Sequence, residues 1–483
     1  MSEKKSVSSG IGTMAVLTIS SKLVRLVILM ITARFLTPED FGVVAAFTMV
    51  FAFAYLIADM GIIRTLIQRP VISDKHVGSA LVLSISLCVL ICLSLFLFAD
   101  DIANQLNVNE IALPLEISGI IFLLLGFSNI CSALFQRSGD VVFIGKLQAL
   151  GTVTGNIFVT VPLLYFDIGF WSIIIGLWVS ELISVVFILL RGWEILHFKV
   201  YKTELTEIIK YATAFFFNST LGLLSQQIDI AIISKMMGST ALGFYSRAMQ
   251  LVEFPNQVYW LVVDRVVFPV MSAMKDDKEK LSQFFLQSLS LLSLALTIGS
   301  LILVVGADQI VLIMMGEQWG EVASILEILG LCIIFRALAS FMDSFIAAYD
   351  LIKLLTIKQI VSLLILITAI WFGADYGVLG VAYAVVITSA MRFLLTVALI
   401  LSCSKVRLIQ ILKVFIPSLI TPLTIFIVYL CVSEVEILQG LFGIIIAAVL
   451  VLSLCIVKPF AFLTSSTGKK LINKNLALIR IKS

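Results

Sequence analysis

The sequence has little charge and almost no histidine. Only 13% of its 483 residues are charged, whereas 60% are hydrophobic, and the mean hydropathy is +1.13. A soluble domain carries about 25% charged residues, and a fold in water could not bury this much apolar surface. The surrounding solvent must therefore be lipid, which excludes a soluble enzyme.

Residues that bind metals or form disulfides are scarce as well. The two histidines, His76 and His197, fall in predicted loops without further ligands nearby. Cys88 and Cys92 share a helix face, but no second ligand pair accompanies them, and the other five cysteines lie in or beside apolar segments. We therefore expect buried thiols, no metal site and no cofactor. A net charge of only +3 gives no support to a nucleic-acid partner.

Long apolar runs fill the chain. A helix needs about 20 apolar residues to cross the hydrocarbon core, and the sequence predicts an all-α polytopic protein with about 14 transmembrane helices. No small-residue cleavage site follows the basic N-terminus, so the first apolar run is not a removable signal peptide. The spans lie near 11–35, 41–60, 78–99, 111–135, 143–165, 170–190, 208–233, 241–263, 282–305, 323–348, 353–373, 378–401, 411–431 and 438–457.

Positive charge alternates between the two sides of this map. Among the 33 Lys and Arg residues, only Arg34 and Lys235 fall in loops on one side, and five lie inside spans. The remaining cations, Lys358 among them, are assigned to the opposite side. Because cytoplasmic loops are enriched in Lys and Arg, we expect a bacterial inner-membrane protein with both termini in the cytoplasm.

Two parts of the chain repeat each other at an offset of 201 residues. The turn at 36–42 corresponds to the turn at 237–243, and Arg34 corresponds to Lys235. Each copy holds six spans, so both copies have the same orientation and are related by an axis along the membrane normal. We expect an N-terminal lobe at 1–200, a C-terminal lobe at 201–403, and two further helices with a cytoplasmic tail at 404–483.

Charged residues also occur inside the spans. A cation at a helix centre costs about 2.5–3.5 kcal/mol, so these side chains should face water, an acidic partner or an anionic ligand. The cations are Lys22, Arg25, Arg247, Arg336 and Arg392, and the acids are Glu181, Asp229, Glu253 and Asp343.

Helical spacing places these charges on polar stripes. One stripe holds Thr18, Lys22 and Arg25, a second holds Arg336, Ser340 and Asp343, and a third holds Thr388, Arg392 and Thr396. Stripes on several helices predict a water-filled cavity between the two six-helix units. Arginine forks and lysine ammonium groups suit phosphate or pyrophosphate, so the five cations are the candidate substrate-binding residues. Asp229, Asp343 and Glu181 are candidates for proton or sodium coupling.

Each charge also has a structural alternative. Arg336 could pair with Asp343 one helix turn away, Arg247 could pair with Glu253, and Arg392 could extend to the cytoplasmic headgroups. The segment 62–76 is either an amphipathic surface helix or an extension of the preceding span.

Several short segments are similar to one family of membrane proteins. They are Ala33–Gly42, Asp59–Ile63 with Leu66–Arg69, Tyr245–Ala248, Phe268–Pro269, Lys275–Asp277 and Gly316–Trp319. In this order they resemble the bacterial polysaccharide flippases, the Wzx-like and colanic-acid-exporter-like branch of the MOP superfamily. That superfamily also includes multidrug and toxin extruders (MATE transporters) and lipid II flippases. The resemblance covers most of residues 10–400.

The resemblance implies 14 helices in two six-helix lobes plus two more. It also implies that an undecaprenyl-pyrophosphate-linked oligosaccharide moves from the cytoplasmic to the periplasmic leaflet by alternating access, for lipopolysaccharide or exopolysaccharide biosynthesis. Arg247 falls within a matching segment. Implied partners are the lipid-linked oligosaccharide and membrane lipids, with the polysaccharide polymerase machinery as a candidate.

Two other functions stay open at this point. A multidrug cation antiporter would use the same fold, with Asp229 as its coupling acid. A membrane polymerase or ligase acting on lipid-linked sugars would be an enzyme, and it would need a sizeable periplasmic loop with catalytic bases. The predicted outer loops are short and acidic, so we expect a transporter without catalytic residues.

Overall fold

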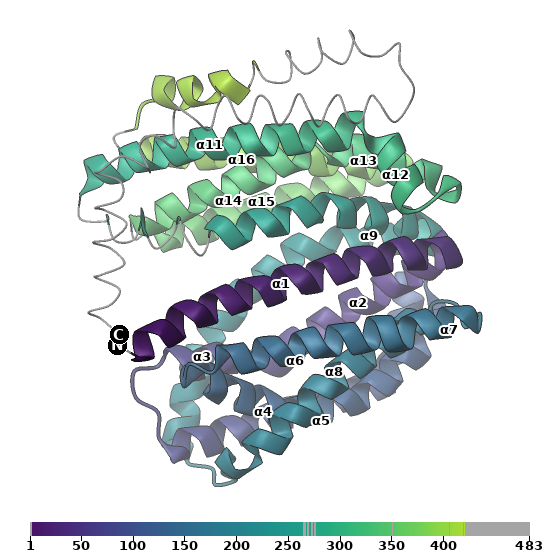
Figure 1. The fold of residues 1–483 in the computed structure, drawn as a ribbon, viewed down its shortest axis with the longest axis vertical. Helices are drawn as coiled ribbons and strands as arrows, with labels where there is room; N and C mark the ends of the chain where they lie inside the picture. Colours follow the sequence, from purple (N-terminus) through teal and green to yellow (C-terminus); the bar gives the residue numbers. More distant parts are fainter. Residues whose placement is uncertain are drawn as a thin grey trace. The chain divides into compact units, whose positions relative to one another are not determined.

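Helices form all the regular secondary structure of the described residues. The computed structural model describes residues 2–263, 267, 270–271, 274, 277–349, 351–404, 406–418 and 420 (Figure 1). The predicted all-α class is confirmed. Helices satisfy every backbone hydrogen bond internally, which hydrocarbon requires of any segment that crosses it. Most of the predicted span 411–431 and all of 438–457 lie outside the described residues.

The chain divides into two compact units. The first comprises Met1–Arg247 with Leu312–Trp319, and the second comprises Ala248–Val311 with the described residues from Gly320 onward. The helices that begin in the first unit are α1 (Ser2–Phe35), α2 (Pro38–Asp59), α3 (Ile62–Gln68), α4 (Asp74–Leu106), α5 (Ala112–Arg137), α6 (Val141–Val153), α7 (Val161–Tyr165), α8 (Trp171–Gly192) and α9 (Lys202–Val262). A π-helical stretch, Thr154–Thr160, joins α6 to α7, and Gly238 breaks α9 with φ 81°.

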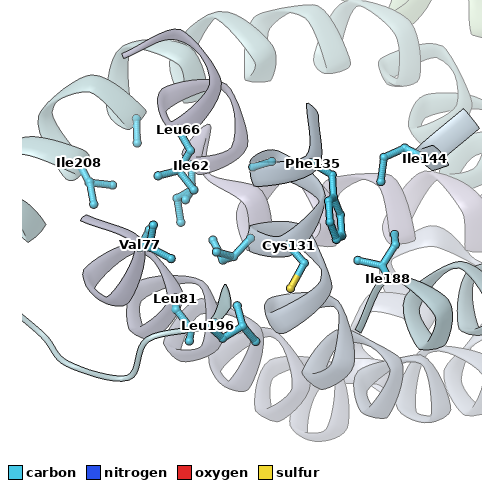
Figure 2. Close-up of a cluster of buried hydrophobic side chains, with 14 of the residues drawn as sticks. Ile62, Leu66, Val77, Leu81, Cys131, Phe135, Ile144, Ile188, Leu196 and Ile208 are labelled. Carbon is cyan, nitrogen blue, oxygen red and sulfur yellow. The ribbon is translucent and has the colours of Figure 1, made fainter. Parts of the chain in front are cut away.

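Helix α5 carries the apolar core at one end of the first unit. Its side chains Cys131 and Phe135 lie among apolar side chains from α3, α4, α6, α8 and α9 (Figure 2). Those neighbours include Ile62, Leu66, Val77, Leu81, Ile144, Ile188 and Ile208. Burying one side chain of this size contributes roughly 1.5–3 kcal/mol relative to water exposure.

The expected burial of thiols is confirmed in part. Cys88, Cys131 and Cys332 are buried, but Cys92 and Cys403 are partly exposed. An i,i+4 pair on one helix need not share one degree of burial, since a helix presents only part of its circumference to the core. Cys431 and Cys455 lie outside the described residues.

The segment 62–76 is neither a plain extension of α2 nor one continuous helix. Met60 and Gly61 adopt left-handed backbone conformations, which end α2 and redirect the chain into the seven-residue helix α3. Arg137 then satisfies the carbonyl groups at the end of this helix, where no intrahelical donor remains. Its guanidinium donates at 2.6–3.2 Å to the carbonyl oxygens of Leu66, Ile67, Arg69 and Pro70.

A second polar tie joins this segment to the start of α9. The Arg69 guanidinium donates to the Glu207 carboxylate, and His76 Nε2 lies 3.4 Å from the same oxygen. His76, expected in a loop, lies in the first turn of α4 and contacts Ser73 Oγ at 2.7 Å. The Arg69 and His76 hydrogen bonds hold the pKa of Glu207 below its usual range.

This tie predicts an acid-sensitive contribution to stability. A lowered pKa means that Glu207 stabilises the fold above the ordinary glutamate range, and that this contribution is lost as the pH falls below about 4. The difference in thermal midpoint between wild type and Glu207→Gln should therefore shrink from neutral pH to acid pH. The exposed Glu194→Gln serves as the control. A Glu207→Gln difference that stays constant with pH would contradict the tie.

The turn before α2 has a dense set of hydrogen bonds. Thr37 Oγ1 accepts from the Asp40 backbone N–H, and Asp40 Oδ2 accepts from the Thr37 N–H at 3.0 Å, which forms a capping box with Pro38 at the first helical position. Asp40 Oδ1 also accepts from the Phe170 N–H at 3.2 Å. One carboxylate therefore starts α2 and fixes the turn before α8.

The two turns related by the 201-residue offset contact each other within the first unit. A Cβ on Gly42 would lie 1.8 Å from the Ser239 carbonyl oxygen, and a Cβ on Gly243 would lie 1.7 Å from the Pro38 carbonyl oxygen. Gly42 corresponds to Gly243 and Pro38 to Ser239 at the same offset, so the contact is reciprocal, as in a twofold interface. Only glycine allows the two backbones to approach this closely.

We predict that either alanine substitution at this contact destabilises the protein. Gly42→Ala and Gly243→Ala each force a methyl group into a backbone carbonyl, and overpacking of this kind costs roughly 1–3 kcal/mol. The control is Gly222→Ala in α9, where an added Cβ meets nothing within 4 Å. Thermal unfolding in detergent should show lower midpoints for the first two variants and an unchanged midpoint for the control. Equal midpoints for all three would refute the close contact.

The second unit is built from the later helices. They are α11 (Lys278–Val305), α12 (Ala307–Met314, whose last residues belong to the first unit), α13 (Gly320–Leu329), α14 (Cys332–Ala348), α15 (Ile352–Ala374) and α16 (Gly377–Cys403). Phe285 of α11 stacks on Phe341 and Phe345 of α14, and all three rings are buried. Helices α13 and α14 meet at a 44° bend, where Ser300 Oγ donates to the Gly330 carbonyl at 2.8 Å.

The first twelve predicted spans all coincide with helices. Helix α1 begins at Ser2, earlier than the expected residue 11, and α4 extends several residues beyond both ends of its predicted span. Within the described part of the chain, eight helices are long and apolar enough to cross a membrane, or nine if the bent α13–α14 pair counts as one span. The chain is therefore a multi-pass membrane protein, and the total of 14 helices remains a prediction.

Candidate substrate-binding site

Two of the expected cations lie on α1. Lys22 is half-buried and Arg25 is exposed, one helix turn apart, so their like charges repel each other. Helix α1 packs along α6 and α7. Arg25 also lies within electrostatic range of the Glu181 carboxylate of α8. The structure thus relates Arg25 to Glu181, a pair that the sequence could not connect.

Polar groups from α2 and α5 lie near these charges. Tyr55 Oη donates to Asn129 Oδ1 at 3.3 Å, and Glu181 and Asp59 act electrostatically on Tyr55. The Asn129 Nδ2 group is buried without a hydrogen-bond partner in the structure, which leaves a donor for a ligand or water. Sequence reasoning did not select Tyr55, because a single tyrosine in an apolar helix is typical of a core residue.

Arg247 lies against an aromatic cluster. Its guanidinium is 4.3 Å from the ring centroid of Phe41, and the Phe41 ring packs edge-on against Trp319 at 5.3 Å. A cation over a ring gains about 0.5–2 kcal/mol without losing its charge. The Arg247 Nε is buried and makes no hydrogen bond in the structure. The alternative that Glu253 pairs with Arg247 is wrong, since Glu253 binds Arg336.

Three of the family-like segments meet at this cluster. Trp319 Nε1 and Gln318 Nε2 donate to the Ala33 carbonyl at 2.8 and 2.6 Å, and so satisfy an acceptor at the end of α1. Phe244 packs edge-on against Trp319 at 6.0 Å. Parts of three distant family-like segments, around Ala33–Phe41, Arg247 and Gln318–Trp319, are therefore packed together within the first unit.

Asp229 has a structural role in α9. It is buried, accepts from Tyr245 Oη at 2.6 Å, and accepts from the Ile230 N–H at 2.9 Å. Because Gly238 separates Asp229 from Tyr245, this hydrogen bond ties the two arms of the broken helix. Ion coupling through Asp229 stays a prediction.

In the second unit, each expected charge pairs with a residue on another helix or helix segment. Arg336 Nη1 lies 3.2 Å from Glu253 Oε1. Asp343 binds two cations, with Oδ1 accepting from Lys358 Nζ and Oδ2 lying 3.3 Å from Arg392 Nη2. The suggested Arg336–Asp343 pair is wrong, because both residues bind partners on other helices. Arg392 lies against Asp343, and its extension to headgroups stays a prediction.

The structure corrects the position of Lys358. The sequence pattern places this residue among the cytoplasmic cations, yet its side chain lies inside α15 and is only 4% exposed. Its partners lie 15 and 38 residues away in sequence, on α14 and α16. Spacing gives one signal that could have selected it, since Lys358 and Ser362 lie at i,i+4 within an apolar run.

We predict that Arg336 and Glu253 are energetically coupled. Arg336→Gln and Glu253→Gln should each lower the thermal midpoint, and the double variant should lose less than the sum, by about 1 kcal/mol. Glu327→Gln, an exposed acid on α13, controls for the removal of one negative charge. Strictly additive losses would show that the pair contributes nothing.

Comparison with known proteins identifies the family and the fold. Residues 31–324 match the model of the polysaccharide biosynthesis protein family. The lipopolysaccharide biosynthesis protein WzxC of Escherichia coli (strain K12) is 22% identical over 401 residues, which are 82% of this chain and 81% of WzxC. The succinoglycan biosynthesis transport protein ExoT of Rhizobium meliloti (strain 1021) is 27% identical over 305 residues, 62% of this chain and 61% of ExoT.

A solved structure has the same fold. The lipid II flippase MurJ, in an inward closed conformation, superposes with a TM-score of 0.75 at 17% identity and covers 92% of this chain and 98% of MurJ. At this identity the likeness concerns the fold alone. The family match spans more than half of the sequence, so this chain belongs to the polysaccharide biosynthesis protein family.

Proposed function

We propose that the protein is a flippase that moves an undecaprenyl-pyrophosphate-linked oligosaccharide from the cytoplasmic to the periplasmic leaflet of the bacterial inner membrane. Its family and the names of its relatives, which include a biosynthesis protein and a transport protein for two polysaccharides, support this function. The oligosaccharide would serve polysaccharide biosynthesis or export, with membrane lipids and a polysaccharide polymerase as further partners.

One observation carries the proposal. Within the described residues, the recorded salt bridges involve other cations, while Lys22, Arg25 and Arg247 take part in none. A cation in a membrane helix without a carboxylate in salt-bridge contact is costly unless it meets water or an anion. A pyrophosphate supplies that anion, and the cations in turn offset the loss of its hydration.

The mechanism follows from the two environments of the substrate. The polyprenyl tail stays in lipid, because moving it into water would expose a large apolar surface. The pyrophosphate and sugars follow the polar groups of the helices, with alternating access to the two leaflets. Both termini would lie in the cytoplasm, as the positive-inside pattern predicts.

Reorientation needs a source of free energy. Glu181, Asp229 and Asp343 are the candidates for coupling to protons or sodium, and each lies near a polar or charged partner. The coupling works only if ion binding favours one conformation over the other. The chain acts as a transporter in this account and makes or breaks no glycosidic bond.

We predict that the α1 cations are required for flipping. A deletion strain carrying Lys22→Ala/Arg25→Ala should accumulate lipid-linked oligosaccharide in the cytoplasmic leaflet and make little polymer, whereas wild type should restore both. The matched control is Lys202→Ala/Lys210→Ala, which removes two exposed cations from α9. The readout is the amount of lipid-linked oligosaccharide in each leaflet, measured after the amounts of the variants in the membrane have been equalised.

The opposite outcome is equally clear. Normal polymer and no accumulation in the deletion strain itself would remove the flippase function. Ethidium efflux that is lost on deletion, is restored by wild type and depends on Asp229 would then favour a multidrug antiporter of the same fold.

A further inference from the structure

We propose that Lys358 and Arg392 form an anion site for the pyrophosphate group of the lipid-linked substrate, and that Asp343 fills this site as an internal counter-ion until the substrate binds. The inference rests on the proposed flippase function and adds a residue, Lys358, and a form of regulation to it. All three residues belong to the second unit.

The geometry is that of an occupied anion site. Asp343 on α14 presents one oxygen to Lys358 on α15 and the other to Arg392 on α16, the latter at 3.3 Å. Lys358 Nζ donates also to Thr396 Oγ1 at 3.0 Å. Two cations from two helices thus hold two oxygens of one anion, which is the arrangement that a phosphate or pyrophosphate group needs.

The charge of the cluster leaves room for a stronger anion. Two cations and one carboxylate give a net charge of +1, and Lys358 is 4% exposed. A buried cation that is only partly neutralised is costly, so a ligand with more than one negative charge would improve the balance. The Ser362 hydroxyl, one helix turn from Lys358, is buried without a hydrogen-bond partner in the structure and adds a donor.

The three side chains of the cluster differ in exposure. The Lys358 side chain is 4% exposed, that of Asp343 is 21% and that of Arg392 is 32%. Asp343 lies near the C-terminal end of α14 and Lys358 near the N-terminal end of α15, so the cluster lies toward these two helix ends. Charge patterning assigns these ends to the cytoplasm, where the substrate is loaded.

A bound pyrophosphate and the Asp343 carboxylate repel each other and compete for the same two cations. Ligand binding therefore displaces Asp343 from Lys358 and Arg392, and Asp343 pairs with both cations again when the ligand leaves.

The other charges on the elements packed around Asp343 are engaged elsewhere or exposed. Arg336 of α14 binds Glu253, and Lys353 of α15 is exposed. On α11, Lys278 lies over the Tyr349 ring and Lys280 binds Asp277, while Glu279 is exposed, as are Glu321 and Glu327 of α13. Among the described residues, the charged groups in salt-bridge contact with Asp343 are thus Lys358 and Arg392.

Binding of farnesyl pyrophosphate to the purified full-length protein tests the proposal. Isothermal titration calorimetry gives the affinity. Lys358→Met should weaken binding by at least about tenfold, because a charge-assisted hydrogen bond is lost. Lys353→Met removes the same charge from an exposed position on the same helix and should leave binding unchanged.

Asp343→Asn removes the negative charge that competes for Lys358 and Arg392. It should bind farnesyl pyrophosphate more tightly than wild type, by several-fold. Weaker or unchanged binding by Asp343→Asn, or equal binding by Lys358→Met and Lys353→Met, would overturn the proposal. If Lys358→Met does not fold, the double variant Asp343→Asn/Lys358→Met takes its place, since removing both partners leaves no unpaired acid.

Two further comparisons separate the sources of failure. If phosphatidylglycerol nanodiscs abolish the difference between Lys358→Met and Lys353→Met, whereas phosphatidylcholine nanodiscs preserve it, the anion is a lipid headgroup and the substrate assignment is overturned. If Lys358→Met flips substrate in cells and binds as wild type does, this inference fails while the flippase function stands. If wild type neither binds farnesyl pyrophosphate nor restores flipping, the flippase function fails.

Discussion

A charge inside a membrane protein must be neutralised, hydrated or bound by a ligand, and this constraint organises the molecule. In the second unit, Arg336, Lys358 and Arg392 all reach carboxylates on other helices or helix segments. In the first unit, Arg247 lies on an aromatic ring and Lys22 and Arg25 share one face of α1. The recorded carboxylate partners of these cations thus lie in the second unit, whereas Lys22 is half-buried and Arg25 is exposed in the first.

A second constraint acts at the turns before α2 and within α9. Backbone contacts at Gly42 and Gly243 allow two helix starts to approach more closely than any other residue would permit. The capping box at Thr37 fixes the first turn of α2, and Trp319 donates a hydrogen bond to the Ala33 carbonyl near the end of α1. Packing of this kind transmits small displacements from one helix to the next, because close-packed interiors are hardly compressible. A transporter that changes conformation needs such rigid contacts as well as mobile ones.

Much of the fold could be predicted from the sequence, because hydropathy over 20 residues is a direct consequence of bilayer thickness. The turn motifs were also predictable, since Thr37, Pro38 and Asp40 have local roles in capping. The pairing of charges was not. Lys358 and Arg392 meet Asp343 through tertiary packing of three helices, and helical spacing along one segment contains no information about a neighbour. Local spacing therefore suggested a pair between Arg336 and Asp343 that the structure replaces with longer-range partners.

Transbilayer movement in proteoliposomes tests the central claim most directly. The purified protein would be reconstituted with a fluorescent undecaprenyl-pyrophosphate-linked oligosaccharide, and an added glycosidase would cleave only the sugars in the outer leaflet. We predict that the fraction of oligosaccharide protected from the glycosidase falls toward zero in vesicles that contain the protein. In protein-free vesicles this fraction should stay at about one half. Equal protection in both would contradict the assignment of this chain as a flippase.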